Sequence, residues 1–389
     1  MAKPPRIAVM LDLETGYWRH TSMYVGLQNY AQDQGWETTI DEYADDTLPA
    51  RRTKSIPYDG VIARASKKLA DRAGRLGVPV VNVWLNSPAQ KTLPGVFPDF
   101  AAIGRLRAEH LLARGFFRFA CLTTNTIAHN LEWRSFSATL KAAGFSCPVA
   151  MVPLAPSKTL AQWRKTEQVI VAAMKNWQPP TGLYVAAEDV GRIVAQMCRS
   201  HGLRIPEDIA IITGWNEETI CLQPRPSLTS VELGGERIGY EAARLLHQLM
   251  DGEKPPTKTI LLPPKGLIVR ESTDFFAVED ELVAAALEYI AANCHRRIGP
   301  DKVAKAVGAE TRTLQLRFRK HLDRPIATEI RRVRIERAKR ELTQSKRPLS
   351  DIARDVGFGE AMRMYEVFRR ELGVTPSEYR KQRQVQVDM

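Results

Sequence analysis

The segment Asp301–Lys381 repeats its own pattern, and this repetition most constrains what the chain can fold into. The sequence VAKAVG at Val303–Gly308 recurs as IARDVG at Ile352–Gly357. Each copy predicts a short helix, a glycine that ends it, a tight turn and a second helix. This is the layout of a helix-turn-helix, whose second helix can lie in the major groove of DNA. The two predicted motifs lie at about residues 302–322 and 351–372.

Between the two copies, Ala327–Thr343 has apolar residues at helical spacing, which predicts one continuous helix. With a rise of ~1.5 Å per residue, this helix is a rigid spacer of roughly 25 Å. Together with the width of the two units, the spacer allows the two recognition helices to lie about one turn of DNA, ~34 Å, apart.

Positive charge is concentrated in the same part of the chain. The whole chain of 389 residues has 56 Lys and Arg against 44 Asp and Glu, a net charge of +12. Residues 296–383 hold 24 of the basic and 12 of the acidic residues, so this segment carries the entire excess. A neutral body joined to a basic module is the charge pattern expected of a protein that binds nucleic acid phosphates.

Three ordered groups of residues give this segment a family resemblance. They are Arg334-x3-Ala338-x3-Leu342, Ile352-Ala353-x3-Gly357-Phe358, and Phe368-x4-Gly373-x-Thr375-Pro376-x2-Tyr379-Arg380. The set resembles the AraC-type DNA-binding domain, which is all-α and contains two helix-turn-helix units. We therefore expect residues 276–389 to form such a domain, with double-stranded operator DNA as its partner.

The facing of the two second helices predicts which residues contact DNA. If Leu314 and Phe318 face the core of the first unit, Arg312, Leu316 and Arg319 lie on the far side. The resemblance implies base contacts from Arg312, Gln315, Leu316, Ala361, Met362, Arg363 and Glu366. Arg319 and Arg370 are interpreted as phosphate contacts. Leu316 and Glu366 depart from the basic or polar residues that are common at these positions of the family.

From Arg6 to about Thr273, short apolar runs alternate with longer helical patterns, which is typical of a parallel α/β sheet. Two such sets in succession predict two lobes with a cleft between them. Their order resembles the type I periplasmic-binding-protein-like sensor domain of the Lac repressor family, here over residues 1–275. The matching stretches include Phe100–Gly115, Ala187–Asp189, Gly202–Ala210, Gly214–Asn216 and Pro226–Val231. The resemblance implies that the chain crosses between the lobes near Arg118, Pro226 and Asp251.

Candidate ligand residues follow the predicted strands, because ligands of open α/β sheets sit beyond the carboxyl ends of the strands. This rule selects Asp12, Trp84, Asn86, Asp189 and Asn216, and Trp18, Trp84 and Trp215 are the candidates for an aromatic face. The resemblance favours Arg134, at the predicted start of a helix, together with Asp189 and Asn216 as ligands for hydroxyl groups. It implies a monosaccharide effector, an aldopentose such as xylose.

The five cysteines form no C-x-x-C pair and no His/Cys cluster at metal-ligand spacing, so we expect no metal, no cofactor and no disulfide. The first residues lack the pattern of a signal peptide, and no apolar run approaches the length of a membrane span. We therefore expect a cytoplasmic protein. Regulators of this kind imply a homodimer, with RNA polymerase as a further candidate partner.

Two function classes compete for the α/β part. In the first it senses a ligand, and the protein is a transcription regulator and not an enzyme. In the second it is a degenerate amidase-like module or serves only dimerisation. Cys121 lies on a predicted strand, but its surroundings lack the glycines that a nucleophile elbow needs.

Overall fold

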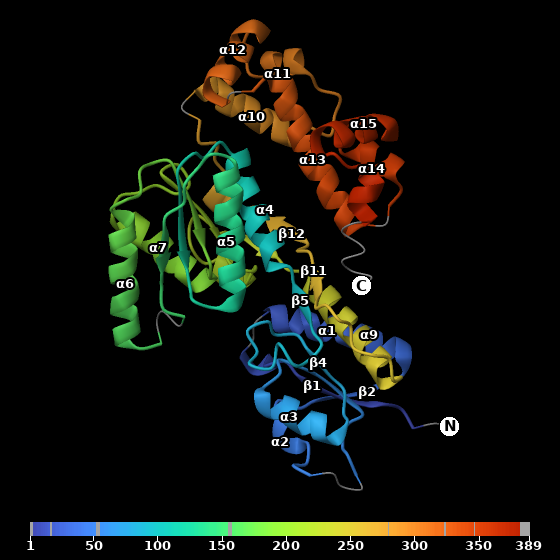
Figure 1. The fold of residues 1–389 in the computed structure, drawn as a ribbon. Coiled ribbons are helices and arrows are strands. Elements are labelled where there is room, and N and C mark those ends of the chain that lie inside the picture. Colours follow the sequence, from blue (N-terminus) through green and yellow to red (C-terminus); the bar gives the residue numbers. More distant parts are fainter. Residues whose placement is uncertain are drawn as a thin grey trace.

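The computed structural model describes residues 3–15, 18–51, 55–154, 158–278, 280–322, 324–345 and 347–381. The chain forms two α/β lobes followed by a helical domain, so the predicted fold class is confirmed (Figure 1). Within these residues, no helix combines the length and the apolar character needed to cross a membrane.

The first lobe is built on a four-stranded parallel sheet with the order β2-β1-β3-β4. Successive side chains of its central strand point to opposite faces: Ile7 and Val9 pack with α1 and α9, whereas Ala8 packs with α3. The elements are β1 (Arg6–Met10), η1 (Leu13–Thr15), α1 (Trp18–Gln34), β2 (Glu37–Ile40), α2 (Ala44–Thr47), β3 (Gly60–Ala63), α3 (Lys67–Leu76), β4 (Val80–Asn82) and α9 (Gly235–Met250).

The second lobe has a six-stranded sheet with the order β12-β10-β9-β8-β6-β7, in which β12 runs antiparallel to β10. One core lies between the sheet and α4 and α5, and the other lies between the sheet and α6 and α7. The elements are α4 (Phe100–Ala113), β6 (Phe119–Thr123), α5 (Ile127–Ala142), β7 (Val149–Met151), α6 (Leu160–Met174), β8 (Thr181–Val185), α7 (Glu188–Ser200), β9 (Ile209–Thr213), α8 (Glu218–Cys221), β10 (Thr229–Glu232), β12 (Gly266–Ile268) and η2 (Glu271–Thr273).

The chain passes between the lobes at residues 98–99, 233–234 and 263–265. Beside the first and third passages, β5 (Val96–Pro98) and β11 (Ile260–Leu262) pair in parallel. The predicted crossings near Arg118, Pro226 and Asp251 are therefore wrong. The helix α9 packs in the first lobe, although β10, the strand directly before it, belongs to the second lobe. The alternation of strands and helices in the sequence continues unchanged through this passage, so it does not show where the chain changes lobe.

The helical domain contains two small cores joined by one long helix. This helix, α13, supplies Ile330 to the first core and Ala338 and Leu342 to the second. Its 19 residues span roughly 28 Å at the usual rise, close to the expected spacer. The helices are α10 (Glu281–Asn293), α11 (Pro300–Ala306), α12 (Thr311–Leu322), α13 (Ile326–Gln344), α14 (Leu349–Asp355) and α15 (Ala361–Leu372).

The first prediction concerns the close packing of α1 against α9. A Cβ atom built on Gly239 would lie 1.8 Å from the backbone oxygen of Met23, so Gly239→Ala must push the two helices apart. We expect a loss of about 1–3 kcal/mol in the free energy of unfolding, measured in urea. Gly74→Ala on α3 is the matched control, because nothing lies within 4 Å of its Cβ position. This substitution should stabilise the chain by about 0.5–1 kcal/mol, and equal effects of the two variants would contradict the packing.

Candidate functional site

The carboxyl ends of parallel strands from both lobes face one cleft, where Arg64 directly follows β3 and Thr124 directly follows β6. The cavity in this interlobe cleft has a volume of about 380 Å³, within the range of small-molecule sites. Its polar and aromatic lining comes from both lobes. The first lobe supplies Arg19, His20, Arg64, Trp84 and Asn86, and the second supplies Phe100, Thr124, Thr126, His129, Glu188, Asp189, Trp215 and Glu217.

On the first lobe, the guanidinium of Arg64 is held between a carboxylate and an aromatic ring. It forms an ion pair with Asp12, and its Cζ lies 4.8 Å from the centre of the Trp84 ring. Asp12 does not line the cavity, but its ion pair orients the Arg64 side chain. This arrangement places a cation and an apolar ring face side by side in the cleft.

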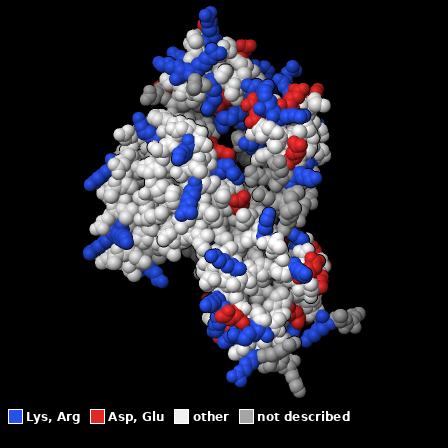
Figure 2. Space-filling model, viewed as in Figure 1, with Lys and Arg blue, Asp and Glu red and all other residues white. Residues whose placement is uncertain are grey.

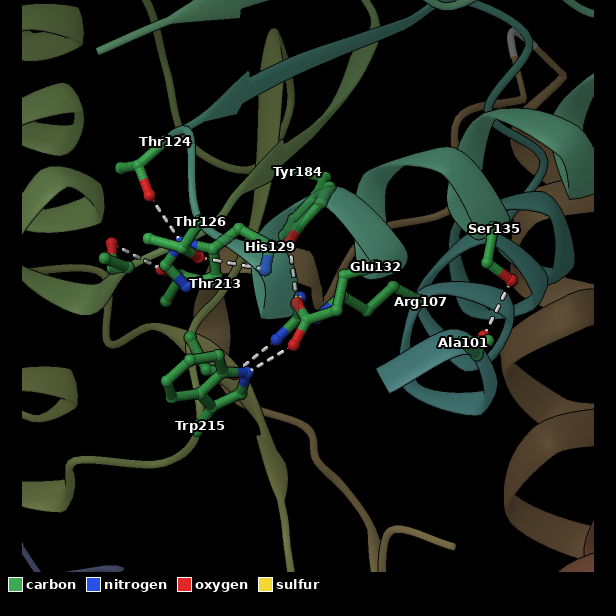
Figure 3. Close-up of polar contacts among 12 residues, drawn as sticks. Ala101, Arg107, Thr124, Thr126, His129, Glu132, Ser135, Tyr184, Thr213 and Trp215 are labelled. Atoms are coloured by element: carbon green, nitrogen blue, oxygen red, sulfur yellow. Dashed lines mark hydrogen bonds and ion pairs between the residues drawn. The ribbon is translucent and has the colours of Figure 1, made fainter. Parts of the chain in front are cut away.

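On the second lobe, His129 is part of the cleft lining, and its ring lies beside that of Trp215 with the centroids 4.9 Å apart (Figure 3). Thr126 caps α5 by accepting a hydrogen bond from the His129 N–H at 3.2 Å, which fixes the first turn of the helix. The Nδ1 atom of His129 lies 2.5 Å from Thr124 Oγ1. Its Nε2 atom is buried and has no hydrogen-bond partner among the described residues. The hydrogen-bonding capacity of this nitrogen is therefore unused, although neighbouring atoms cover it in this arrangement of the lobes.

Burial lowers the pKa of His129 to about 4, so the imidazole is neutral near pH 7. A neutral ring carries one donor and one acceptor nitrogen, and the Thr124 hydroxyl can pair with either form. Asp189 lies nearby at the start of α7, half-buried, and burial raises its pKa. The second lobe thus offers a neutral ring and a carboxyl group rather than a strong positive charge.

Three contacts join the lobes across the cleft. The Cζ atom of Arg19 lies 5.3 Å from the centre of the Trp215 ring. Asn86 Oδ1 accepts a hydrogen bond from the Ala128 N–H at 3.1 Å, and Glu217 Oε1 accepts one from the Trp18 N–H at 3.1 Å. Through these contacts the two lobes touch each other beside the cavity.

The sequence-predicted ligand residues do not all reach the cleft. Trp84 and Asp189 line it, and Asp12 stands behind Arg64. Trp18 is 55% exposed and lines a neighbouring cavity beside the second and third lobe passages. The side chain of Asn216 is buried and bonded to Glu232, Ser230 and Arg270.

Arg134 is the predicted ligand residue that the structure places farthest from its expected role. The helix expected to begin there begins instead at Ile127, after the Thr126 cap, so Arg134 falls in its middle. It is exposed and is not part of the cleft lining.

Sequence reasoning missed Arg19, His20, Arg64, Thr124, Thr126, His129 and Glu217. The rule that ligands sit beyond strand ends would have found Arg64 and Thr124, because each directly follows an apolar strand. No local signal marks His129, which reaches the cleft through the capped turn of α5.

The second helices of the two helix-turn-helix units present the predicted residues to solvent. Leu314 and Phe318 of α12 are buried, as are Met364 and Phe368 of α15. The predicted DNA contacts lie on the opposite faces: Arg312, Gln315, Leu316, Arg319, Met362, Arg363, Glu366 and Arg370 are exposed, and Ala361 is half-buried. Leu316 and Met362 are 61% and 68% exposed, so both apolar side chains are open to solvent.

Figure 2 shows Lys and Arg side chains gathered over the helical domain, near α11 and α12 in Figure 1. The second lobe carries fewer charged groups on the same face, and most of that face is neutral. The distribution agrees with the charge excess in residues 296–383.

Cys121 lies in β6 with its side chain buried, and burial raises the pKa of its thiol well above the usual value. A thiol that is kept protonated and out of contact with solvent is a poor nucleophile. This environment counts against an amidase-like role for the α/β domain.

Comparison with known proteins supports both halves of the chain. Residues 108–273 match the periplasmic binding protein-like domain family, and residues 303–382 match a helix-turn-helix domain family. The xylose operon regulatory protein of Escherichia coli K12 is 28% identical over 388 residues, which cover 97% of each chain. The regulatory protein SoxS of Salmonella typhimurium is 34% identical over 100 residues, which cover 94% of SoxS and 26% of this chain.

Among solved structures, the xylose-binding transcription activator xylR has the same fold. The two superpose with a TM-score of 0.61 at 24% identity, over 98% of each chain. The agreement therefore includes both lobes and the helical domain.

A two-lobed, periplasmic-binding-protein-like domain followed by two helix-turn-helix units is the architecture of a transcription regulator with a sensor domain. The chain belongs to the AraC family, as a XylR-like member with a Lac-repressor-type, periplasmic-binding-protein-like domain.

The second prediction follows from the buried imidazole of His129. Its folded pKa of about 4 lies below the ordinary value of 6.5, so between these values the unfolded chain binds the proton and the folded chain does not. Stability is therefore complete above pH 6.5 and falls as the pH drops toward 4. At pH 5, relative to pH 7.5, this group alone should cost about 2 kcal/mol.

The measurement is urea unfolding of the full chain at pH 7.5 and pH 5. His129→Gln should reduce the pH-dependent loss, whereas the same change at the exposed His201 should leave it unchanged. An identical loss in wild type and His129→Gln would show that the imidazole is not shielded as described.

Proposed function

We propose that the chain is a sugar-responsive transcription regulator that senses a monosaccharide, with xylose as the first candidate, in the interlobe cleft. It binds double-stranded operator DNA through α12 and α15. The observation that carries the proposal is the cleft itself, where two tryptophan rings and polar side chains from both lobes surround a cavity of about 380 Å³. The relationship over nearly the whole chain to a protein named as a xylose operon regulator supports the choice of sugar.

The lining of the cleft fits the two chemical faces of a sugar ring. Trp84 and Trp215 offer apolar ring surface to C–H groups, one from each lobe. His129 and Asp189 line the cavity, and their imidazole and carboxyl groups can pair with hydroxyl groups, which both donate and accept. A site with polar groups placed to bind hydroxyls discriminates strongly against analogues that lack one, because its buried groups would stay unpaired.

Ligand contacts on both lobes give the closed arrangement a higher affinity than an open one. Without such a difference, the sugar could not shift the equilibrium between them. The contacts of Arg19 with Trp215 and of Asn86 with the first turn of α5 form only when the lobes meet. We infer that the sugar and these rim contacts stabilise closure together.

For DNA, the exposed side chains of α12 and α15 supply the chemistry of base recognition. Arg312, Gln315 and Arg363 can pair with guanine or adenine edges, and Glu366 can accept from cytosine. The exposed Leu316 and Met362 can contact thymine methyl groups. Arg319 and Arg370 are proposed to contact phosphates, which position the protein without reading sequence.

We further propose that the regulator works in the cytoplasm as a homodimer, with residues 1–275 as the sensor and 276–389 as the DNA-binding module. In a dimer, lobe closure would set the distance between the two helical domains and hence the half-sites they reach together. RNA polymerase is a candidate partner of the DNA-bound protein. The shielded thiol of Cys121 supports a binding role for the α/β domain over a catalytic one.

The third prediction separates base reading from phosphate binding. Arg363→Ala should lose about 1–3 kcal/mol of binding free energy on a DNA site selected by the wild-type protein, mostly as lost discrimination at one base pair. Arg370→Ala should instead weaken selected and random DNA alike and lower the salt dependence of binding. Binding is measured by fluorescence anisotropy over a range of salt concentrations. The same profile for both variants would refute the proposed facing of α15.

The fourth prediction concerns the effector. Calorimetry of the full chain with xylose, arabinose, ribose and glucose should detect binding, with xylose the tightest. Asp189→Ala and His129→Phe should each weaken xylose binding by about 10- to 100-fold, because each removes a hydrogen bond to a hydroxyl.

Arg134→Ala is the matched control, since the structure leaves this side chain outside the cleft. It should bind xylose as the wild type does, and a loss as large as that of Asp189→Ala would restore Arg134 as a ligand residue. If the wild type binds none of the four sugars, the sensing part of the proposal fails while the DNA-binding part stands.

A further inference from the structure

A buried network lies directly behind the interlobe cleft (Figure 3). The indole N–H of Trp215, in the cleft wall, donates a hydrogen bond to Glu132 Oε1 at 2.5 Å. Glu132 is completely buried in α5, where its Oε2 atom accepts from the Tyr184 hydroxyl at 2.6 Å and forms an ion pair with Arg107 of α4. One carboxylate therefore connects the cleft wall to the helix α4.

This network can transmit a displacement because its parts cannot move independently. Arg107 also donates a hydrogen bond to the Gly214 carbonyl oxygen at 2.5 Å, next to Trp215 in the chain. Separating either charge from its partner inside the protein would leave an unpaired buried ion, which is strongly unfavourable. In addition, a Cβ atom on Gly104 would lie 2.0 Å from the Glu132 backbone oxygen, so α4 and α5 are in backbone contact.

The other end of α4 holds the start of the helical domain. The N–H of Ala277 donates to the Arg114 carbonyl oxygen at 2.8 Å, and the Arg114 guanidinium forms an ion pair with Asp274 at 3.1 Å. Its Cζ atom also lies 5.1 Å from the centre of the Phe276 ring. Both backbone and side-chain contacts therefore attach the chain to the end of α4.

Residues 275–277 alternate between two cores. Phe275 and Ala277 pack with Ala108 and Leu111 of α4 in the second lobe. Phe276 packs with Leu287 and its neighbours in the first core of the helical domain. Residues 275–277 thus contact α4 on one side and the first core of the helical domain on the other.

Farther along α4, the two domains are separated by a cavity of about 560 Å³. Arg105 and Glu109 of α4 line one side, and Val333 of α13 and Leu287 of α10 line the other. The helical domain is therefore attached at the end of α4, and this cavity lies between α4 and α13 farther along. This arrangement leaves room for a change of angle at the fixed point.

We propose that α4 carries the signal from the cleft to the helical domain, with Glu132 and Arg107 as positioning residues and Phe276 as the point of attachment. The inference rests on the proposed sugar sensing and adds the route by which it reaches DNA. A sugar packed on Trp215 shifts the indole, the Glu132–Arg107 pair moves α4 with it, and Phe276 turns the first core of the helical domain.

The fifth prediction uses Tyr184→Phe in the full chain, because this change removes one hydrogen bond to Glu132 and keeps the ring. Tyr184 does not line the cleft, so the xylose dissociation constant should stay within threefold of the wild type. The change in operator affinity caused by saturating xylose should fall at least threefold. Calorimetry gives the first quantity, and anisotropy on operator DNA with and without xylose gives the second.

Tyr30→Phe is the matched control, since it removes a buried hydroxyl bonded to His247 in the first lobe, away from α4. It should leave both quantities unchanged. Phe276→Leu tests the far end of the route and should likewise reduce the effect of xylose on operator affinity without altering xylose binding.

Hydrogen exchange of the wild-type protein gives a readout that does not depend on any variant. Xylose should change the exchange of α4 and of residues 275–278. Unchanged exchange there, or a normal xylose effect in both Tyr184→Phe and Phe276→Leu, would overturn the route. An equal loss of xylose binding and xylose effect in Tyr184→Phe would also overturn it, because the network would then serve the cleft alone. If the wild type binds no sugar in calorimetry, the proposed sensing fails first, and this route falls with it.

Discussion

The second lobe depends on one ion pair that water does not reach. Arg107 and Glu132 are both completely buried, and both retain charge-bearing groups in a protein interior where isolated ions are very costly. Their cost is offset by three further partners: the Tyr184 hydroxyl, the Trp215 indole and the Gly214 carbonyl group. Within the described residues, only the Nε atom of Arg107 in this pair is left without a hydrogen bond. Apolar side chains of similar volume could fill this space, but they would leave the indole N–H without an acceptor. The pair thus fixes the direction of a cleft residue as well as the packing of two helices.

The two recognition surfaces use opposite electrostatic strategies. The helical domain spreads exposed cations over solvent-facing helices, which suits a polyanion whose charge is regular and whose counterions are released on binding (Figure 2). The cleft instead neutralises its own charges, since Arg64 is paired with Asp12 and burial keeps His129 uncharged. A neutral, hydroxyl-bearing ligand is bound by direction and shape more than by charge.

The sequence was informative where a pattern is local and uninformative where lobes interleave. The helix-turn-helix repeat predicted the facing of α12 and α15, because core residues at helical spacing also determine which side chains remain outside. The rule that ligands sit beyond strand ends selected Trp84 and Asp189, which line the cleft. It also selected Asn216, which does not line the cleft because its amide is hydrogen-bonded to Glu232 and Arg270. The lobe passages could not be predicted, because nothing in a strand or helix pattern states which of two sheets it joins. His129 and the Glu132–Arg107 pair were missed for a related reason: their roles arise from tertiary contacts that local spacing does not encode.

The three passages between the lobes have a consequence for how this chain is made and how it can change. The first lobe contains residues 6–82 but also needs α9, so its core is incomplete until the chain has been synthesised past Met250. The sheet of the second lobe is likewise incomplete until β12 has been synthesised. Neither lobe is a unit that could be exchanged with another protein or cut free by a single break. The helical domain, by contrast, follows as one uninterrupted segment that begins after both sheets are complete. Gene fusion could therefore attach it to a finished sensor in one step, whereas the two lobes could only have been inherited together.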